Sequence, residues 1–485
     1  MSDLSVRAAG AAWWSALEIL ARYGMQFVVM VILARLLTPE DFGLVAMLLV
    51  FISIGTLFVD AGFGAALVQR QNITVNDETT IFIFTTCASL IVAGILALSA
   101  PWIAAFFDQP KLIDLTRFMA LALPLGALAS VPDAILTIKL DFKSRARAEV
   151  IASILSGIIA ITLALHGAGV WSLAWQGLIS IGIRGLLLWS YTSWRPRGVY
   201  SHASFQSLFR FGGYMLLSNL LNTIAVRLQS LAIGKLFDAR QLGFYTLAQN
   251  TQSAPATFMG SLLTRVGLPV FSTIADDRER LLGALRSSLR MAMFLFVPCM
   301  VGIAIVARPL IELLYGEKWS SAAPILSLLS LSSTLWPIHV LNLAAISAQG
   351  RSDLFLRLEV IKQCIGIALI IAFAAWGPLA IASAVLTSGL FAAMLNTYYS
   401  KKMLGYGLMA QLRDQWPTFA LSLVVAGIGW AILHWTKASI FTMLVAVITC
   451  AFTYLLLAVL TKNEALRELK HTLQTLRPKS STISS

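Results

Sequence analysis

Charged side chains are scarce in this chain. Of its 485 residues, 58% are hydrophobic and only 12% are charged, whereas soluble domains average about 25% charged residues. No polar stretch between the apolar segments is long enough to form a soluble domain. This composition excludes a function carried by such a domain and places the activity inside a membrane.

The motifs of several enzyme classes are also missing. No G-x-x-x-x-G-K-[ST] loop occurs, which excludes ATP hydrolysis by that route. There is no H-E-x-x-H motif, and the four cysteines lie singly in apolar segments, so neither a metal site nor a disulfide is expected. No cofactor is expected, and the first apolar segment lacks the small-residue exit of a cleaved signal peptide.

Fourteen apolar stretches account for nearly all of the sequence. Most are long enough to cross a hydrocarbon core, which takes roughly 20 helical residues. Helices are the default spanning form, because lipid offers backbone amides no hydrogen-bond partner. We therefore predict an all-α integral membrane protein with fourteen transmembrane helices, at 12–36, 42–68, 79–105, 113–137, 147–166, 169–192, 205–234, 242–271, 288–312, 322–348, 354–376, 378–400, 416–434 and 438–461.

The net charge of +13 is distributed unevenly. If the N-terminus is cytoplasmic, 23 lysines and arginines fall on the cytoplasmic side and 8 on the opposite side. This asymmetry follows the positive-inside rule and predicts that both termini are cytoplasmic. Topology and attraction to anionic lipids account for the basic excess, so nucleic-acid binding is not expected.

The sequence repeats itself at an offset near 200. Residues 32–37 correspond to 232–237, and Gly43 corresponds to Gly243; three further anchors, 100–103 with 308–311, 147–151 with 357–361 and 168–170 with 376–378, follow in the same order. Each half then holds six helices, so the halves have parallel topology, related by an axis along the membrane normal. Such a two-halved bundle suits alternating access.

This repeat predicts the domain organisation. The predicted parts are an N-terminal bundle at 1–203, a C-terminal bundle at 204–403, an extra helix pair at 404–462 and a disordered basic cytoplasmic tail at 463–485.

Polar residues inside the spans are the functional candidates, because charges are costly in a membrane. Helix 12–36 carries Glu18, Arg22 and Gln26 within one narrow arc. We interpret this stripe as lining a cavity between the halves. A purely structural ion pair between Glu18 and Arg22 is the alternative.

The repeat-related helix 205–234 carries a matching stripe that includes Asn219, Asn222 and Arg227. Asn222 corresponds to Arg22, which favours the cavity interpretation, although interhelical hydrogen bonding is also common for such amides. Gln249 lies on the polar face of helix 242–271.

Asp60 is the intramembrane acid of helix 42–68. It can pair with Arg22, bind a cation or carry a proton, so proton or sodium coupling stays open. Arg184 and Lys362 lie near cytoplasmic helix ends, where snorkelling is expected.

These residues suggest a cationic, hydrogen-bonding cavity. Arg22 and Arg227 are permanently charged and can fork onto phosphate oxygens. The side chains of Gln26, Asn219, Asn222 and Gln249 suit sugar hydroxyls. We therefore expect an anionic, sugar-bearing lipid headgroup as the substrate.

The chain resembles a known family in its opening and second spans. Residues 32–43, Ile-Leu-Ala-Arg-Leu-Leu-Thr-Pro-Glu-Asp-Phe-Gly, and 58–70, Phe-Val-Asp-Ala-Gly-Phe-Gly-Ala-Ala-Leu-Val-Gln-Arg, are similar to Wzx-type polysaccharide flippases. These belong to the multidrug/oligosaccharidyl-lipid/polysaccharide exporter superfamily, and the branch for lipopolysaccharide, colanic acid and teichuronic acid export is the most similar.

The resemblance implies a MATE-like fold of fourteen helices with a central cavity, in a bacterial inner membrane. It implies flipping of an undecaprenyl-pyrophosphate-linked glycan, not catalysis, with glycosyltransferases and a polymerase as possible partners. A cation-coupled multidrug exporter of the same fold and a membrane-embedded glycan polymerase are the alternatives; short outer loops argue against the polymerase.

Overall fold

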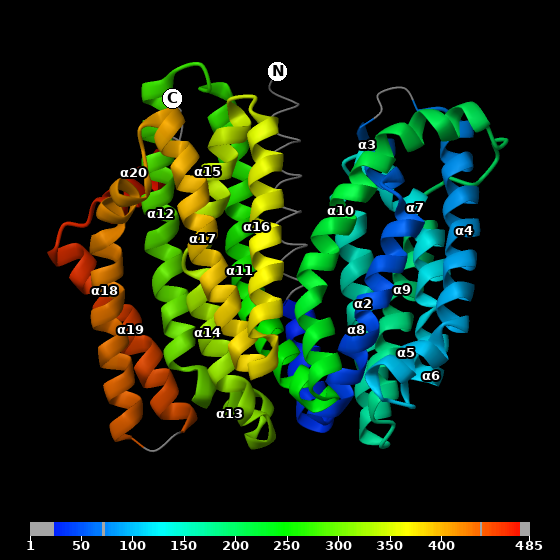
Figure 1. Ribbon diagram of the computed structural model, residues 1–485, viewed down its shortest axis with the longest axis horizontal. Coiled ribbons are helices and arrows are strands. Elements are labelled where there is room, and N and C mark those ends of the chain that lie inside the picture. Colours follow the sequence, from blue (N-terminus) through cyan, green and yellow to red (C-terminus); the bar gives the residue numbers. More distant parts are fainter. Residues whose placement is uncertain (1–23, 70–72, 437–438, 476–485) are drawn as a thin grey trace, which may run out of the picture. The chain divides into compact units, whose positions relative to one another are not determined.

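The computed structural model describes residues 24–69, 73–436 and 439–475 (Figure 1). Within these ranges the chain is helical and contains no strand. It divides into two compact units, residues 1–247 and 248–485, and each is described by itself.

Eleven helical segments in the described ranges are long and apolar enough to cross a membrane, which confirms the prediction of an all-α membrane protein. The helix Gly24–Leu36 is apolar but shorter within the described residues. Two further helices, α10 (His202–Leu236) and α11 (Ala239–Thr273), have 35 residues each but are more polar. The count of fourteen transmembrane helices stays a prediction.

The first unit packs its long helices around α2 and α7. Helix α2 contacts α4 and α10, α7 contacts α4 and α9, and α8 lies along α9. Besides α10 and the beginning of α11, its helices are α2 (Pro39–Asp60), α3 (Phe63–Gln69), α4 (Val75–Leu98), α5 (Ala100–Phe107), α6 (Leu112–Met119), α7 (Ala122–Ile138), α8 (Phe142–Leu165) and α9 (Val170–Tyr191).

Three predicted spans of the first unit are interrupted in the structure. Segment 42–68 is divided between α2 and α3, because Ala61 and Gly62 adopt left-handed φ angles of 42° and 77°. Segment 79–105 is divided between α4 and α5, where Pro101 occupies the first turn of α5. Segment 113–137 is divided between α6 and α7. Apolarity indicates the length of a span but not where the backbone breaks.

Corresponding positions of the repeat begin α2 and α11 in the same way. The Thr38 hydroxyl accepts a hydrogen bond from the Asp41 N–H at 3.4 Å, and the Asp238 carboxylate accepts one from the Gln241 N–H at 2.6 Å. Thr38 and Asp238 are 200 residues apart in the sequence. Both are N-cap residues of the type that starts helices.

The beginnings of α2 and α11 approach each other through reciprocal glycines. A Cβ atom on Gly43 would lie 1.6 Å from the Ala239 carbonyl oxygen, and one on Gly243 would lie 1.9 Å from the Pro39 carbonyl oxygen. Any side chain there would collide with backbone, so only glycine permits this contact. The repeated glycine found in the sequence is thus explained by the packing.

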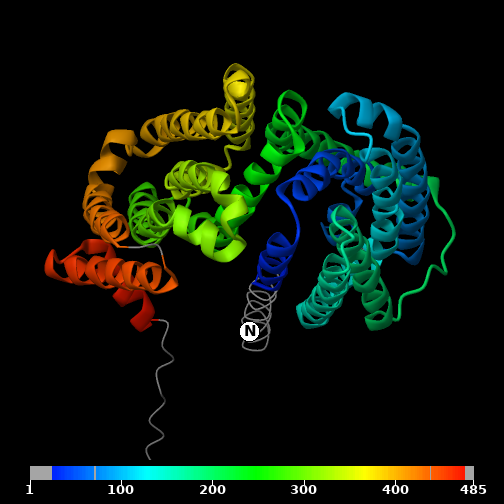
Figure 2. The same cartoon turned by 90° about the horizontal axis from the view of Figure 1, so that it is seen from below.

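The second unit is centred on α12, which contacts α14, α15 and α18. Helices α18 and α19, in orange and red, lie at the edge of this unit (Figures 1 and 2). Besides α11 from residue 248, the elements are α12 (Arg278–Ile305), α13 (Ala307–Tyr315), η1 (Glu317–Ala322), α14 (Ala323–Ser333), α15 (Trp336–Ala348), α16 (Ser352–Phe373), η2 (Ala374–Trp376), α17 (Pro378–Leu404), α18 (Leu408–Trp435), α19 (Ile440–Leu460) and α20 (Glu464–Thr475).

A buried amide pair joins α18, which is outside the repeat, to α15. Asn342 donates from Nδ2 to Gln411 Oε1 at 3.0 Å, and Gln411 donates from Nε2 to Asn342 Oδ1 at 2.8 Å. Both side chains are fully buried. Their reciprocal bonds satisfy polar groups that would be costly to leave unpaired in this interior.

Part of the tail predicted to be disordered is a helix in the structure. Helix α20 docks on α12: the Arg290 guanidinium pairs with both Glu464 and Glu468, and Ser287 donates to Glu468 at 3.0 Å. Ala465 is buried beneath it. The basic composition of the tail did not indicate this helix. The contact that holds it joins two glutamates one turn apart to an arginine that is distant in the sequence.

Candidate functional site

The structure describes six of the eight predicted site residues. Glu18 and Arg22 lie outside the described residues. In the first unit are Gln26, exposed on the helix Gly24–Leu36, Asp60, half-buried at the end of α2, and, on α10, Asn219 and Asn222, exposed, and Arg227, half-buried. Gln249 is half-buried on α11 in the second unit.

Helix α10 runs antiparallel to α2, which sets the levels of the candidate residues. Near one end of α10, a Cβ on Gly234 would lie 3.2 Å from the Met47 side chain. Near the other end, Leu208 and Leu216 pack against the cluster that contains Ala61. Both helices rise equally per residue, so the end of α2 lies level with the middle of α10.

This register brings Asp60 to the level of Asn219 and Asn222. Arg227 lies further along α10, level with the middle of α2. The first unit thus gathers an acid, two amides and an arginine within a few helical turns. A common level does not place these side chains on one face, so the interpretation of these residues as one polar surface stays a prediction.

The Asp60 carboxylate has a local structural contact. Its Oδ1 accepts a hydrogen bond from the Gly64 N–H at 3.3 Å, and a Cβ on Gly64 would lie 3.2 Å from the same oxygen. The carboxylate is therefore held at the break between α2 and α3, beside the first turn of α3. Pairing with Arg22, cation binding and proton transfer were the roles expected for Asp60, and the contact with Gly64 was not among them because the break was not predicted.

Arg227 is half-buried, and the described residues supply no carboxylate within ion-pair distance of it. Its guanidinium is charged at any physiological pH and presents a planar set of donors. A half-buried cation of this kind favours an anionic ligand.

Two other amides, one on α10 and one on α11, serve packing instead. The Tyr245 hydroxyl, on fully buried Tyr245, donates to Gln229 Oε1 at 2.6 Å. Gln252 donates from Nε2 to Ser333 Oγ at 2.7 Å. Polar stripes on α10 and α11 therefore combine residues that fix neighbouring helices with residues that remain accessible.

A four-charge cluster in the first unit was not predicted. Asp133 Oδ1 lies 2.9 Å from Arg145 Nε and 2.8 Å from Arg184 Nη2, and Arg184 Nε lies 2.9 Å from Glu149 Oε2. The cluster joins α7, α8 and α9 and is electrically balanced, which indicates a structural role. Snorkelling was expected for Arg184, but its guanidinium forms these ion pairs instead. Asp133 belongs to no sequence motif that would have indicated its role.

Within the described ranges, no three histidine, cysteine or acidic side chains come close enough together to hold a metal ion. Among its described residues, α10 presents a guanidinium cation and amide groups that can donate and accept hydrogen bonds.

Known proteins resemble this chain over most of its length. The model of the family described as "Polysaccharide biosynthesis protein" matches residues 32–324. The succinoglycan biosynthesis transport protein ExoT of Rhizobium meliloti is 32% identical over 66% of this chain, and the match spans 65% of ExoT. The teichuronic acid biosynthesis protein TuaB of Bacillus subtilis is 24% identical over 96% of this chain and 99% of TuaB.

A solved structure shows the same fold. The lipid II flippase MurJ, in an inward closed conformation, aligns with 94% of this chain and 99% of its own length, with a TM-score of 0.74 and 14% identity. At this identity the similarity shows the fold alone.

Proposed function

Because this chain belongs to the polysaccharide biosynthesis protein family, we propose that it flips undecaprenyl-pyrophosphate-linked oligosaccharides from the cytoplasmic to the outer leaflet of a bacterial inner membrane. The observation that carries the proposal is the full-length likeness to a polysaccharide biosynthesis protein and to the fold of a lipid flippase. These relatives are named for transport or flipping and not for catalysis.

We assign the headgroup to the polar surface of α10 and its repeat partner. Arg22 and Arg227 engage the pyrophosphate, because a guanidinium can donate two parallel hydrogen bonds to phosphate oxygens. The amides of Gln26, Asn219, Asn222 and Gln249 contact sugar hydroxyls. Alternating access then exposes the headgroup to one side of the membrane at a time, while the lipid tail stays in the bilayer.

Two acidic residues, Glu18 and Asp60, are proposed to couple transport to an ion gradient or to position other groups. Glu18 orients Arg22, and Asp60 either takes part in proton or sodium coupling or holds the break between α2 and α3. Transport into vesicles with and without each ion gradient decides whether either ion drives flipping. If Asp60 is only structural, Asp60→Asn leaves the gradient dependence unchanged.

We further propose that fourteen helices cross the membrane. The eleven apolar segments, the helix that includes Gly24–Leu36, and the more polar α10 and α11 make up this number. An even number agrees with two cytoplasmic termini. Glycosyltransferases and a polysaccharide polymerase would supply and consume the lipid-linked glycan.

Replacing Arg227 tests the assignment. Arg227→Ala should abolish surface polysaccharide in a strain that depends on this chain, and should stop flipping of a fluorescent lipid-linked oligosaccharide in vesicles. Arg227→Lys keeps the charge but loses the fork, so we expect partial activity.

Arg117→Ala is the matched control, since Arg117 is an exposed arginine that pairs with exposed Asp114 at 3.9 Å. It should export normally. Normal surface polysaccharide in the Arg227→Ala strain, at normal expression, would show that Arg227 is not part of the site. If the unmodified protein flipped no lipid-linked glycan in vesicles, the proposed function would be overturned.

A further inference from the structure

The second unit has a hollow between α13 and the end of α18, at the end opposite α20 (Figure 1). Its volume is about 470 Å³, within the range of roughly 300–1,000 Å³ found for small-molecule sites. In the proposed topology this end of the unit faces the outer side of the membrane. The hollow belongs to neither α10 nor the polar surface assigned to the headgroup.

An aromatic pair forms one wall of this hollow. The rings of Trp430 and His434, one turn apart on α18, stack with centroids 4.8 Å apart and planes at 9°. Trp430 is 60% exposed although its ring is held by this stacking. Two parallel rings make a flat surface with an apolar face, which suits the C–H face of a sugar ring.

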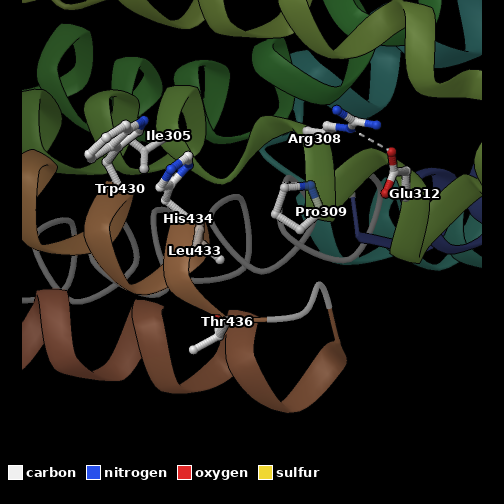
Figure 3. A pocket seen from close by; sticks show the side chains of 8 residues that line it. All are labelled: Ile305, Arg308, Pro309, Glu312, Trp430, Leu433, His434 and Thr436. Carbon is white, nitrogen blue, oxygen red and sulfur yellow. Dashed lines mark hydrogen bonds and ion pairs between the residues drawn. The ribbon is translucent and has the colours of Figure 1, made fainter.

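An ion pair lies on the other side of the hollow (Figure 3). Arg308 Nε donates to Glu312 Oε1 at 2.9 Å, one turn along α13. The side chain of Arg308 is 78% exposed, so its two terminal nitrogens remain accessible. The guanidinium is charged at any physiological pH.

Arg308 also borders a second hollow, of about 440 Å³, whose other lining residues come from the end of α12, from η1 and from α14. Ser320 and Ser321 contribute hydroxyl groups to its lining. One cation thus lies between an aromatic wall and a group of hydroxyls. The corresponding position of the first half is Ala100, so the repeat itself does not require an arginine here.

From this arrangement we propose that the hollow between α13 and α18 binds an anionic, hydroxyl-bearing headgroup, such as an acidic sugar. The terminal nitrogens of Arg308 bind the carboxylate or phosphate, and the sugar face stacks on Trp430 and His434. Glu312 orients Arg308 and accepts a hydrogen bond from a ligand hydroxyl. The same chemistry occurs in an acidic oligosaccharide and in phosphatidylglycerol, whose phosphate carries a hydroxylated headgroup.

Calorimetric titration of the full chain in nanodiscs of neutral phosphatidylcholine tests this proposal. The probe is a trimer of galacturonic acid, with maltotriose as the uncharged counterpart. We expect binding of the acidic trimer only, and at least about tenfold weaker binding for both Arg308→Gln and Trp430→Leu. Arg308→Lys, which keeps a point charge, should lose less. Glu312→Gln keeps an acceptor oxygen but loses the charged partner that orients Arg308, so it should weaken binding, though less than Arg308→Gln does.

The first unit offers matched controls. Arg117→Gln removes another exposed, acid-paired arginine, and Trp102→Leu removes a tryptophan that is 73% exposed. Both should bind the trimer like the unmodified chain. Equal binding of maltotriose, or unchanged binding by both Arg308→Gln and Trp430→Leu, would overturn the proposal.

A second arm identifies the source of the ligand. Nanodiscs that contain phosphatidylglycerol should suppress trimer binding if the lipid headgroup occupies the hollow, and the suppression should disappear in Arg308→Gln. If trimer binding is unaffected by phosphatidylglycerol, the hollow is selective for glycans. Because binding is measured without transport, failure of the proposed flipping would leave this result intact, and failure here would leave flipping intact.

Discussion

At the scale of single residues, charge inside this protein serves two different ends. Asp133, Arg145, Arg184 and Glu149 neutralise one another and connect three helices. Arg227 is half-buried without a carboxylate partner among the described residues. A balanced cluster stabilises the fold, whereas an unbalanced cation is suited to an anionic ligand.

Asp133→Asn should destabilise the first unit. The substitution leaves Arg145 and Arg184 without the carboxylate they share. Breaking a fully buried pair costs roughly 3–5 kcal/mol, but these side chains are 21% and 30% exposed, so we expect about 1–3 kcal/mol. Thermal unfolding of the purified protein in detergent measures the change.

Asp114→Asn provides the comparison. Asp114 pairs with Arg117 through side chains that are 78% and 55% exposed. Such a surface pair contributes at most about 1 kcal/mol, so stability should hardly change. Equal destabilisation by the two substitutions would contradict a structural role for the cluster.

At the scale of helices, close approach depends on residues that have no side chain. The start of α2 meets the start of α11 at Gly43 and Gly243, whose contacts are reciprocal. The same two elements begin with equivalent N-caps, at Thr38 and Asp238. The repeat in the sequence therefore corresponds to a repeated way of starting a helix and placing its first turn.

Gly43→Ala should separate these helix ends. The added Cβ would lie 1.6 Å from the Ala239 carbonyl oxygen, a distance that only a backbone shift can relieve, and overpacking of this kind costs about 1–3 kcal/mol or more. Gly243→Ala should have a similar effect. Both would lower the unfolding temperature and the rate of flipping.

Gly94→Ala in α4 is the matched control, since nothing lies within 4 Å of a Cβ built there. Removing a glycine from a helix interior should stabilise it by up to about 1 kcal/mol. If Gly43→Ala were as stable as Gly94→Ala, the contact between α2 and α11 would not exist in the protein.

At the scale of the whole molecule, topology links the sequence to the proposed transport. The asymmetry of lysine and arginine predicts cytoplasmic termini, and flipping from the cytoplasmic leaflet requires that the headgroup enter from that side.

Cysteine labelling tests this orientation. In a variant without Cys87, Cys299, Cys364 and Cys450, Ser321→Cys should react with a membrane-impermeant maleimide in intact spheroplasts. Lys143→Cys should react only after the membrane is permeabilised. The reverse pattern would invert the topology and overturn cytoplasmic termini.

Apolar stretches, repeat anchors and family motifs were sufficient to predict an all-α membrane protein and its family, because hydropathy and local motifs need no knowledge of packing. The spans 42–68 and 79–105 show where this stops: their breaks depend on left-handed residues and on a proline in a first helical turn, which apolarity does not reveal. The candidate site was predicted as residues but not as an arrangement, and its roles stay predictions.

By itself, the sequence determined that the chain lies in a membrane, which residues are polar there, and which parts repeat. Only the tertiary structure decided which of those polar residues are already satisfied. Gln229 and Gln252 are hydrogen-bonded to side chains of other elements, Asp60 contacts the backbone at Gly64, and Arg184 has two carboxylates. The reason is physical: leaving a buried polar group unpaired is costly, and partners distant in sequence meet only when the helices pack.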